Sequence, residues 1–427
     1  MIRKKFSASQ RILFSLLIVG CFTINGFAQR QEIKEGAIVQ NFYTRNDRPL
    51  FWFLSDQNRR KATEWLTMIA TADHFGICLS KEQSDQIKVL LLSNFTLDDK
   101  IKEQRDRQIT GLVLHFIREL QEGNIPFDYD EVKISRDSVY IGQLLNSKPD
   151  QTVSQIVATL ECQDHDYLLL KKFLNDSVLN SEIDSAKYKK VVRAMNYRRY
   201  FASNHQTEYI IANIPAAEAT YYRNDSLQLK MRTVVGMKSN PSPTIASYIT
   251  TIVTFPLWNV PHSISVKEIL PKVQNNVNYL DKNDFEVVDT KGNVIDDSGL
   301  IWKNYNRNNF PYLFRQATGA RNSLGVLKFN LRNPFSIYLH STNSQSAFGR
   351  DRRFLSHGCI RLEKAFELAK TLAPDKIDIQ ELKIGKKNTE SKTIKLPQKI
   401  GVFIIYNPLT LTDGKVNFLS DVYGLIN

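Results

Sequence analysis

The sequence predicts an α+β protein in which a helical N-terminal domain is followed by a mainly β C-terminal domain. The chain has 427 residues, which is enough for two or three domains of about 150 residues each. Apolar residues recur at helical spacing between residues 29 and 205. From about Glu208 onward the pattern changes to the period of two that is typical of half-buried strands.

Helix boundaries in the N-terminal domain are marked by capping residues. Ser80–Gln83 has the pattern of a capping box, and apolar Ile87 and Leu90 follow it at helical spacing. Thr96–Asp99 offers a second helix start, and Gly123 is a natural stop for the helix that follows. The pattern therefore predicts several amphipathic helices whose apolar faces form a core.

Turn-type residues divide the C-terminal domain into strands. Each expected turn lies between two stretches of alternating polar and apolar residues. The expected pairs are Glu208–Tyr222 with Leu227–Gly236, Leu324–Leu331 with Ser336–His340, and two last strands around Asp413-Gly414. One or two helices accompany these strands in the prediction.

The composition is that of a folded chain with a basic surface. Hydrophobic residues make up 42% and charged residues 24% of the sequence, which excludes a wholly disordered chain and a membrane protein with many spans. The formal charge is +13, and removal of the four basic residues of segment 1–28 lowers it to +9. A basic surface suits nucleic acid, an anionic membrane or another anionic polymer, and the charge does not choose among them.

Residues 1–28 have the three parts of an export signal. A basic start at Arg3–Lys5 precedes the apolar run Ile12–Val19, and small residues lead to a cleavage point after Ala28. The run is too short for a membrane span of about 20 residues. An alternative stays open, because Ile18–Cys21 resembles a lipobox, and cleavage there would leave Cys21 as a lipid tether in the inner or outer membrane. Both interpretations predict an exported protein of the periplasm or cell envelope.

Three cysteines lie beyond the signal segment: Cys78, Cys162 and Cys359. An odd number at wide spacing does not form a disulfide framework, although a Cys78–Cys162 pair stays open. The sequence contains neither Cys-x-x-Cys nor His-Glu-x-x-His, which weakens thioredoxin-like and zinc-protease hypotheses. A leftover thiol in an oxidising compartment calls for a functional explanation.

Residues 335–372 are the most informative stretch. A strand-borne His340 precedes Cys359 by nineteen residues, and apolar residues at helical spacing follow Cys359. We expect Cys359 at the first turn of that helix, where the helix dipole favours the reactive thiolate. Gly358 allows close approach of a substrate to backbone amides, and Arg361 adds positive charge. Two alternatives stay open, namely a buried structural cysteine and a zinc site with His340 and His357.

These residues resemble the active-site signature of the L,D-transpeptidase catalytic domain, the YkuD-type fold. The resemblance is carried by His340 and by Ser356-His357-Gly358-Cys359-Ile360-Arg361. It extends to the large, scaffold-bearing members from Gram-negative envelopes. The segments that carry this wider similarity are Met231–Gly236, Trp258–Pro261, Asn322–Phe329, Tyr338–His340 and Asp421–Gly424, with weaker signals at Asn41–Tyr43 and Leu120–Gly123.

The resemblance implies a domain plan and a set of roles. Residues 29–205 would be the helical scaffold domain and 206–427 the catalytic domain, with a lid-like insertion at about 257–315, called here the lid segment. Cys359 would be the nucleophile and His340 its base. The remaining implied roles are orientation of His340 by the Ser341 backbone carbonyl, an oxyanion hole at Gly358, and substrate binding by Tyr338, His357, Arg361 and Trp258.

The implied reaction forms 3→3 cross-links in peptidoglycan. The cysteine takes the acyl group of a tetrapeptide stem, releases D-Ala and passes the acyl group to a second stem. No metal and no organic cofactor are expected, the partners are peptidoglycan stem peptides rather than nucleic acid, and carbapenems should acylate the cysteine. The alternatives are a hydrolytic L,D-carboxypeptidase or endopeptidase and a non-catalytic envelope-binding protein.

Two departures from the larger relatives affect substrate anchoring. The roughly thirty residues between Leu168 and Tyr197 are too few for the peptidoglycan-binding module that those relatives insert in the scaffold. The loop Gln316–Ala320 lacks the prolines common in the family. Neither departure touches the expected nucleophile.

Overall fold

The computed structural model describes residues 36–44, 50–92, 98–133, 151–179, 183–204 and 206–426. The expected export signal, with Cys21, lies outside these residues. The chain divides into two compact units. The helical unit comprises residues 1–126, 134–205 and 407–427, and the barrel unit comprises residues 127–133 and 206–406.

This division differs from the sequence-based boundary in two segments. The hairpin of β14 (Leu409–Thr412) and β15 (Lys415–Phe418) belongs to the helical unit, because Leu409 is buried in one core with residues of α8 and α9. The short strand β1 (Tyr129–Asp130) belongs to the barrel unit, because it pairs with β5.

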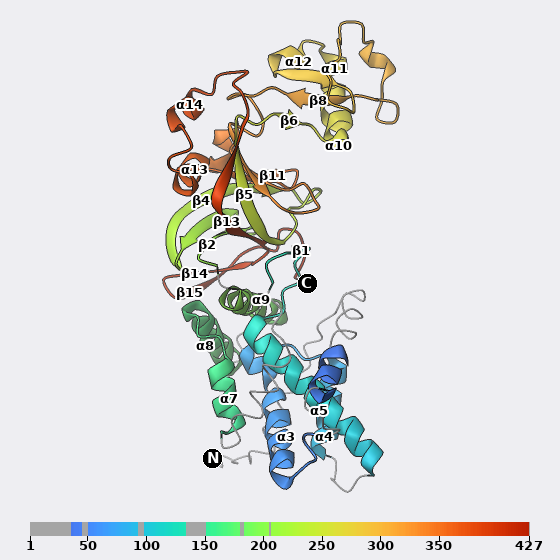
Figure 1. The fold of residues 1–427 in the computed structure, drawn as a ribbon, viewed down its shortest axis with the longest axis vertical. Coiled ribbons are helices and arrows are strands. Elements are labelled where there is room, and N and C mark those ends of the chain that lie inside the picture. The colour runs from blue at the N-terminus through green and yellow to red at the C-terminus, as the bar shows by residue number, and fades with distance from the viewer. Residues whose placement is uncertain are drawn as a thin grey trace, which may run out of the picture. The chain divides into compact units, whose positions relative to one another are not determined.

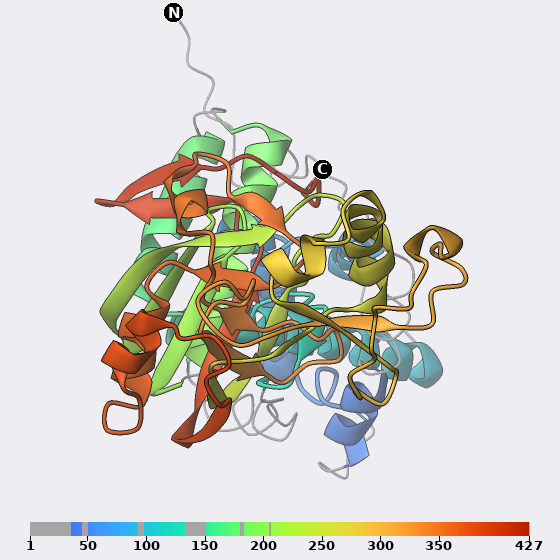
Figure 2. The ribbon, with the colours of Figure 1, turned by 90° about the horizontal axis from the view of Figure 1, so that it is seen from above.

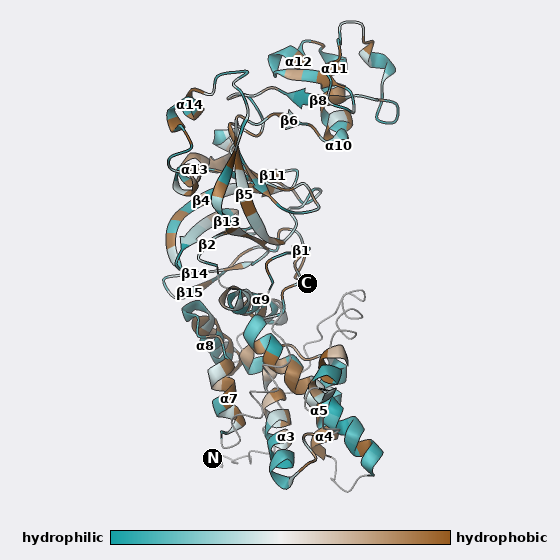
Figure 3. Ribbon diagram, viewed as in Figure 1, coloured by the Kyte–Doolittle hydropathy of each residue, from teal (hydrophilic) through white to brown (hydrophobic). Residues whose placement is uncertain are grey.

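The helical unit is built from amphipathic helices around an aromatic-rich core. Its buried centre includes Trp52, Trp65 and Phe116. Figure 3 shows α5 hydrophilic at its N-terminal end and hydrophobic further along, which matches the burial of its residues from Ile109 onward. The helices are α3 (Asp56–Ile69), α4 (Lys81–Leu92), α5 (Asp99–Glu122), α7 (Val153–Leu160), α8 (His165–Leu179) and α9 (Ser185–Ser203).

Local capping explains where these helices begin and end. The predicted capping box is confirmed, since Ser80 N–H donates to Gln83 Oε1 at 2.8 Å and Gln83 N–H donates to Ser80 Oγ at 3.1 Å. Asp98 caps α5, and Gly123 ends it with a φ of +68°. Such a φ suits glycine because it has no Cβ.

The barrel unit is a sheet that closes on itself (Figure 1). Its strands follow the order β1-β5-β13-β2-β3-β4-β12-β10-β9, and β9 pairs back with β5. Residues such as Ile249, Ile252 and Phe329 are fully buried, so the interior is a packed core. The strands on this path are β2 (Glu208–Asn213), β3 (Glu218–Arg223), β4 (Ser226–Gly236), β5 (Ile245–Thr254), β9 (Leu327–Leu331), β10 (Leu339–His340), β12 (Ile360–Leu362) and β13 (Lys392–Ile405).

Several strand predictions need correction in their bounds. The stretch Glu208–Tyr222 is two strands, β2 and β3, that pair with each other. The predicted turn after β3 is confirmed, and Asn224 and Asp225 both have positive φ, as a tight hairpin turn requires. The stretch Ser336–His340 shrinks to β10, because Ser336 itself has a φ of +57° and breaks the strand.

The lid segment forms a small sheet of its own, in the order β6-β8-β7. It has a separate core that includes Trp302, Phe310 and Phe314. Figure 2 shows its yellow and gold elements to one side of the green and orange barrel strands. The elements are β6 (Trp258–Asn259), α10 (His262–Ile264), the π-helical turn η2 (Ser265–Ile269), α11 (Leu270–Asn275), α12 (Tyr279–Lys282), β7 (Phe285–Val288), η3 (Trp302–Asn304) and β8 (Leu313–Gln316).

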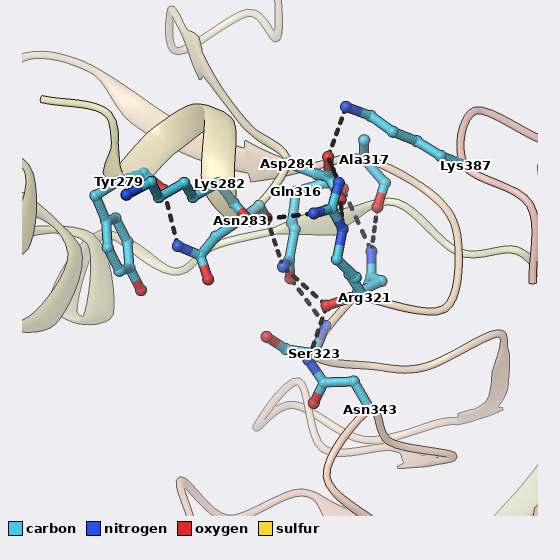
Figure 4. A network of polar contacts seen from close by, with 11 residues as sticks. Tyr279, Lys282, Asn283, Asp284, Gln316, Ala317, Arg321, Ser323, Asn343 and Lys387 are labelled. Atoms are coloured by element: carbon cyan, nitrogen blue, oxygen red, sulfur yellow. Dashed lines mark hydrogen bonds and ion pairs between the residues drawn. The ribbon is translucent and has the colours of Figure 1, made fainter.

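A buried carboxylate ties the lid segment to the barrel (Figure 4). Asp284 is 6% exposed and receives Arg321 Nε at 2.7 Å and Lys387 Nζ at 2.5 Å. Gln316 adds hydrogen bonds to the carbonyls of Asn283 and Arg321, at 2.9 and 3.2 Å. Since Arg321 and Lys387 lie outside the lid segment, these contacts fix its base.

Two further observations concern the described residues as a whole. No helix among them is long and apolar enough to cross a membrane. Neither Cys78 nor Cys162 forms a disulfide bond in this structure, so the pair left open by the sequence is not made.

Candidate active site

Two short parallel strands bring the expected catalytic residues to one face of the barrel sheet. In β10 and β12, Leu339 pairs with Ile360 and His340 pairs with Arg361. Ile360 N–H donates to the Tyr338 carbonyl at 3.1 Å, so Cys359 lies opposite Tyr338 at the start of the pair. Alternate residues of a strand share a face. Tyr338, His340, Cys359 and Arg361 therefore point to the same side, with Cys359 diagonal to His340.

Cys359 does not begin a helix, so that prediction was wrong. It immediately precedes β12, and the next helix, α13, begins at Ala365. The buried side chains of Ile360 and Leu362 follow the alternation of a strand. A helix dipole acts only within the first turn, so it cannot activate this thiol.

The turn before Cys359 is held by hydroxyl groups. Ser356 Oγ donates to the Cys359 carbonyl at 2.6 Å and accepts from Gly358 N–H at 3.2 Å. Ser242 Oγ donates to the Gly358 carbonyl at 2.7 Å. Gly358 has a φ of +113°, and a Cβ there would lie 3.0 Å from Ile337 Cδ1, so this position suits only glycine. The Gly358 amide, expected in the oxyanion hole, points to Ser356 in this structure.

Ser341 positions His340 more by its side chain than by its carbonyl. Ser341 Oγ accepts the N–H groups of Val326 and Leu327, each at 3.0 Å, and donates to the Leu324 carbonyl at 3.1 Å. These bonds fix the turn before β9 against the end of β10. The carbonyls of Ser341 and Leu324 lie near the imidazole and raise its pKa, but His340 Nδ1 has no hydrogen-bond partner among the described residues.

Burial shifts the pKa values of the imidazole and the thiol toward their uncharged forms. Burial and the positive charges of Arg361 and Lys328 together lower the pKa of His340 to about 3. Burial also raises the pKa of the Cys359 thiol, against hydrogen bonds from Tyr338 and the charges of Lys328 and Arg361. The thiol donates to the Ser336 carbonyl, with sulfur and oxygen 3.8 Å apart.

The residues of this barrel match a known family. Residues 207–379 match the family described as the L,D-transpeptidase catalytic domain, YkuD. Residues 37–174 match the family described as the scaffold domain, so the helical unit contains the predicted scaffold.

A relative supports the transpeptidase assignment over part of the chain. A protein of Haemophilus influenzae, named provisionally as an L,D-transpeptidase, is 34% identical over 218 residues. The match covers 50% of this chain and 44% of that protein, so the chain spans less than half of its relative's length.

Solved structures of two transpeptidases are also similar to the chain. A mutant L,D-transpeptidase of Enterococcus faecium has 10% sequence identity to this chain and a TM-score of 0.23. The superposed region covers 48% of this chain and 51% of the chain of that protein. L,D-transpeptidase 1 of Mycobacterium tuberculosis has 13% identity and a TM-score of 0.18, covering 47% and 61%. At these scores the structures add nothing to the family match.

Two residues of the lid segment reach this site. A side-chain hydrogen bond from Trp258 lowers the pKa of Tyr338, although burial raises that pKa overall. Glu268 Oε1 lies 2.5 Å from Nε2 of His357. The sequence placed Trp258 and His357 at the site but did not indicate Glu268, because a lone acid 89 residues earlier carries no local signal.

Lys328 is the second residue that the sequence did not indicate as part of the site. It lies on β9, in register with His340 on β10, and its Nζ lies 4.2 Å from the centre of the Tyr338 ring. Burial lowers the pKa of Lys328, and the opposing charge is that of Cys359. The wider resemblance contained this lysine, but only strand register shows that it faces the cysteine.

Within the described residues, no group of three or more His, Cys, Asp or Glu side chains is placed to hold a metal ion. The zinc alternative for His340, His357 and Cys359 therefore has no geometric support. His357 is already paired with Glu268.

Proposed function

We propose that the chain is a peptidoglycan L,D-transpeptidase of the cell envelope that uses Cys359 as its acyl-accepting nucleophile. The observation that carries this proposal is the shared face of Cys359, His340 and Tyr338 within a transpeptidase domain. A nucleophilic thiol beside an imidazole is the arrangement that acyl transfer needs. The basic sequence suits an anionic wall polymer.

The first half-reaction makes a thioester. The sulfur of Cys359 attacks the carbonyl carbon of the amide after the third residue of a tetrapeptide stem. The backbone amide of Cys359 is suited to stabilise the resulting oxyanion, whereas the Gly358 amide donates to Ser356 Oγ. When the C–N bond breaks, His340 relays a proton to the nitrogen of D-Ala, which leaves, and this proton balances the one that the Cys359 thiol lost on attack.

The second half-reaction makes the cross-link. The side-chain amine of another stem attacks the thioester carbonyl, His340 accepts the proton that this amine loses, and the sulfur leaves. Water in place of the amine would give a tripeptide instead. The contacts of Trp258 and Glu268 with the site support a role of the lid segment in admitting the acceptor.

The test uses the mature chain with purified disaccharide-tetrapeptides. We expect a dimer that has lost one D-Ala, detected by mass spectrometry. Cys359→Ala should form none, and Cys78→Ala, which removes a half-buried thiol of the helical unit, should form as much as the natural chain. Absence of dimer from the natural chain, with tripeptide as product, would favour hydrolysis. Undiminished dimer from Cys359→Ala would refute the proposal.

A further inference from the structure

Two cations beside the nucleophile have no acidic partner among the described residues. Burial lowers the pKa of Lys328 and that of Arg361. In both cases the negative charge of Cys359 acts in the opposite direction and raises the pKa. Arg361 Nε is buried without a hydrogen-bond partner. Desolvated cations are costly unless an anion compensates them, so the site is built to hold a negative charge.

The geometry places both cations around the sulfur. Lys328, His340 and Arg361 form one row across β9, β10 and β12, through the pairs His340–Lys328 and His340–Arg361. Tyr338 and Cys359 form the next row on the same face. Lys328 extends across this row boundary, because its ammonium lies 4.2 Å from the ring centre of Tyr338, and Tyr338 acts to lower the pKa of the thiol.

The imidazole is a poor source of the compensating positive charge. His340 is 4% exposed and its Nδ1 has no acceptor within hydrogen-bond geometry. Protonation would put a third cation beside Lys328 and Arg361, which like-charge repulsion disfavours. A proton on sulfur is therefore more easily lost to solvent than moved to His340.

We propose that Lys328, together with Arg361, stabilises the thiolate that the buried Cys359 forms when it loses its proton, beside a neutral His340. Lys328 is thus a positioning residue that acts through the charge of the Cys359 sulfur. This inference rests on the proposed function of Cys359 as the nucleophile and goes beyond it. The thiol proton passes to solvent base, with loss of the Ser336 contact. The leaving amine later takes one proton from solvent through His340, so the proton count balances.

The titratable groups on the same face as the sulfur come from three strands. They are Lys328 of β9, Tyr338 just before β10, His340 of β10 and Arg361 of β12. His357, two residues before Cys359, is paired with Glu268 of the lid segment. Lys328 is the member whose charge can be removed with little change of shape, since methionine has a similar length.

The experiment measures the rate of Cys359 alkylation by iodoacetamide against pH, with thiolate absorbance as a second readout. Lys328→Met should raise the apparent pKa of the thiol by about one to two units, a loss of roughly ten-fold or more in thiolate at neutral pH. Lys328→Arg should restore it, and His340→Gln should leave it nearly unchanged. Lys399→Met is the matched control, since Lys399 also lies over a tyrosine ring, at 3.8 Å from Tyr248.

Two results would overturn the inference. One is an unchanged thiol pKa in folded Lys328→Met, and the other is a rise in His340→Gln as large as that in Lys328→Met. A measurement without variants is the NMR titration of His340, which should stay neutral while the thiolate forms; an imidazolium that appears with the thiolate contradicts the proposal. Alkylation needs no wall peptide, so failure of the dimer assay alone would leave this inference standing.

Discussion

His340 makes the stability of the barrel unit sensitive to acid. It is 4% exposed, and burial with two neighbouring cations lowers its pKa to about 3. In the unfolded chain a histidine has a pKa of about 6.5. Between these two values the unfolded chain binds a proton that the folded chain does not. The free energy of unfolding therefore rises with pH across this window and falls on acidification.

The size of the effect follows from the width of the window. Each unit of pH below the unfolded pKa costs about 1.4 kcal/mol. At pH 4, about two and a half units below the unfolded value, His340 destabilises the folded barrel by about 3 kcal/mol relative to pH 7. His340→Gln cannot titrate and should lack this loss.

The assay is urea unfolding at pH 7 and pH 4, followed by pulse-labelled hydrogen exchange of β5 peptides. This strand pairs with β13 and β9, so its exchange reports the barrel unit alone. Carboxylates titrate alike in the natural chain and in His340→Gln and cancel in the comparison. Equal losses of stability in the two proteins between pH 7 and pH 4 would refute the reasoning.

Three other substitutions test the supports of the site. Ser341→Ala leaves the buried amides of Val326 and Leu327 without an acceptor, so we expect a loss of about 2–4 kcal/mol in thermal or urea unfolding; an unchanged midpoint would contradict the positioning role. Asp284→Asn keeps a residue type that tolerates the φ of +57° but removes the charge between Arg321 and Lys387. Because those cations are 62% and 51% exposed, the loss in the free energy of unfolding should be only about 1–2 kcal/mol. Hydrogen exchange should become faster in β7 and β8 and stay unchanged in β5. An equal acceleration in all three strands would argue against a local anchor. Glu268→Ala breaks the half-exposed pair with His357, should cost less than about 1 kcal/mol, and should speed exchange in residues 265–275; unaltered exchange there would mean that the pair does not hold the lid segment.

Contiguous motifs explain what the sequence predicts well. The Ser356–Arg361 signature, the Ser80–Gln83 capping box and the Gly123 stop each act within a few residues of the chain. Their geometry is therefore set locally, and the structure reproduces the capping box and the stop. The two classes of element, helices first and strands second, follow from periodicity alone.

The errors have two physical sources. Cys359 was expected on a helix because Leu362 and the apolar residues of α13 fit one helical stripe, although Leu362 belongs to β12. Periodicity over a short stretch cannot separate a strand end from a helix start. The sequence did not indicate Lys328 as a site residue, because its position opposite His340 depends on the antiparallel register of β9 and β10. That register is a property of the tertiary structure. The last hairpin was likewise assigned to the barrel by chain order, whereas Leu409 packs with α8 and α9.

The most direct test of the central claim is intact-mass spectrometry of the mature chain after incubation with a carbapenem, followed by peptide mapping. If the Cys359 sulfur is the acyl acceptor, one drug molecule should add to the peptide that contains Cys359, and Cys359→Ala should gain no mass. A folded natural chain that gains no mass, or one that carries the adduct on Cys78 or Cys162 instead, would contradict the assignment of the nucleophile.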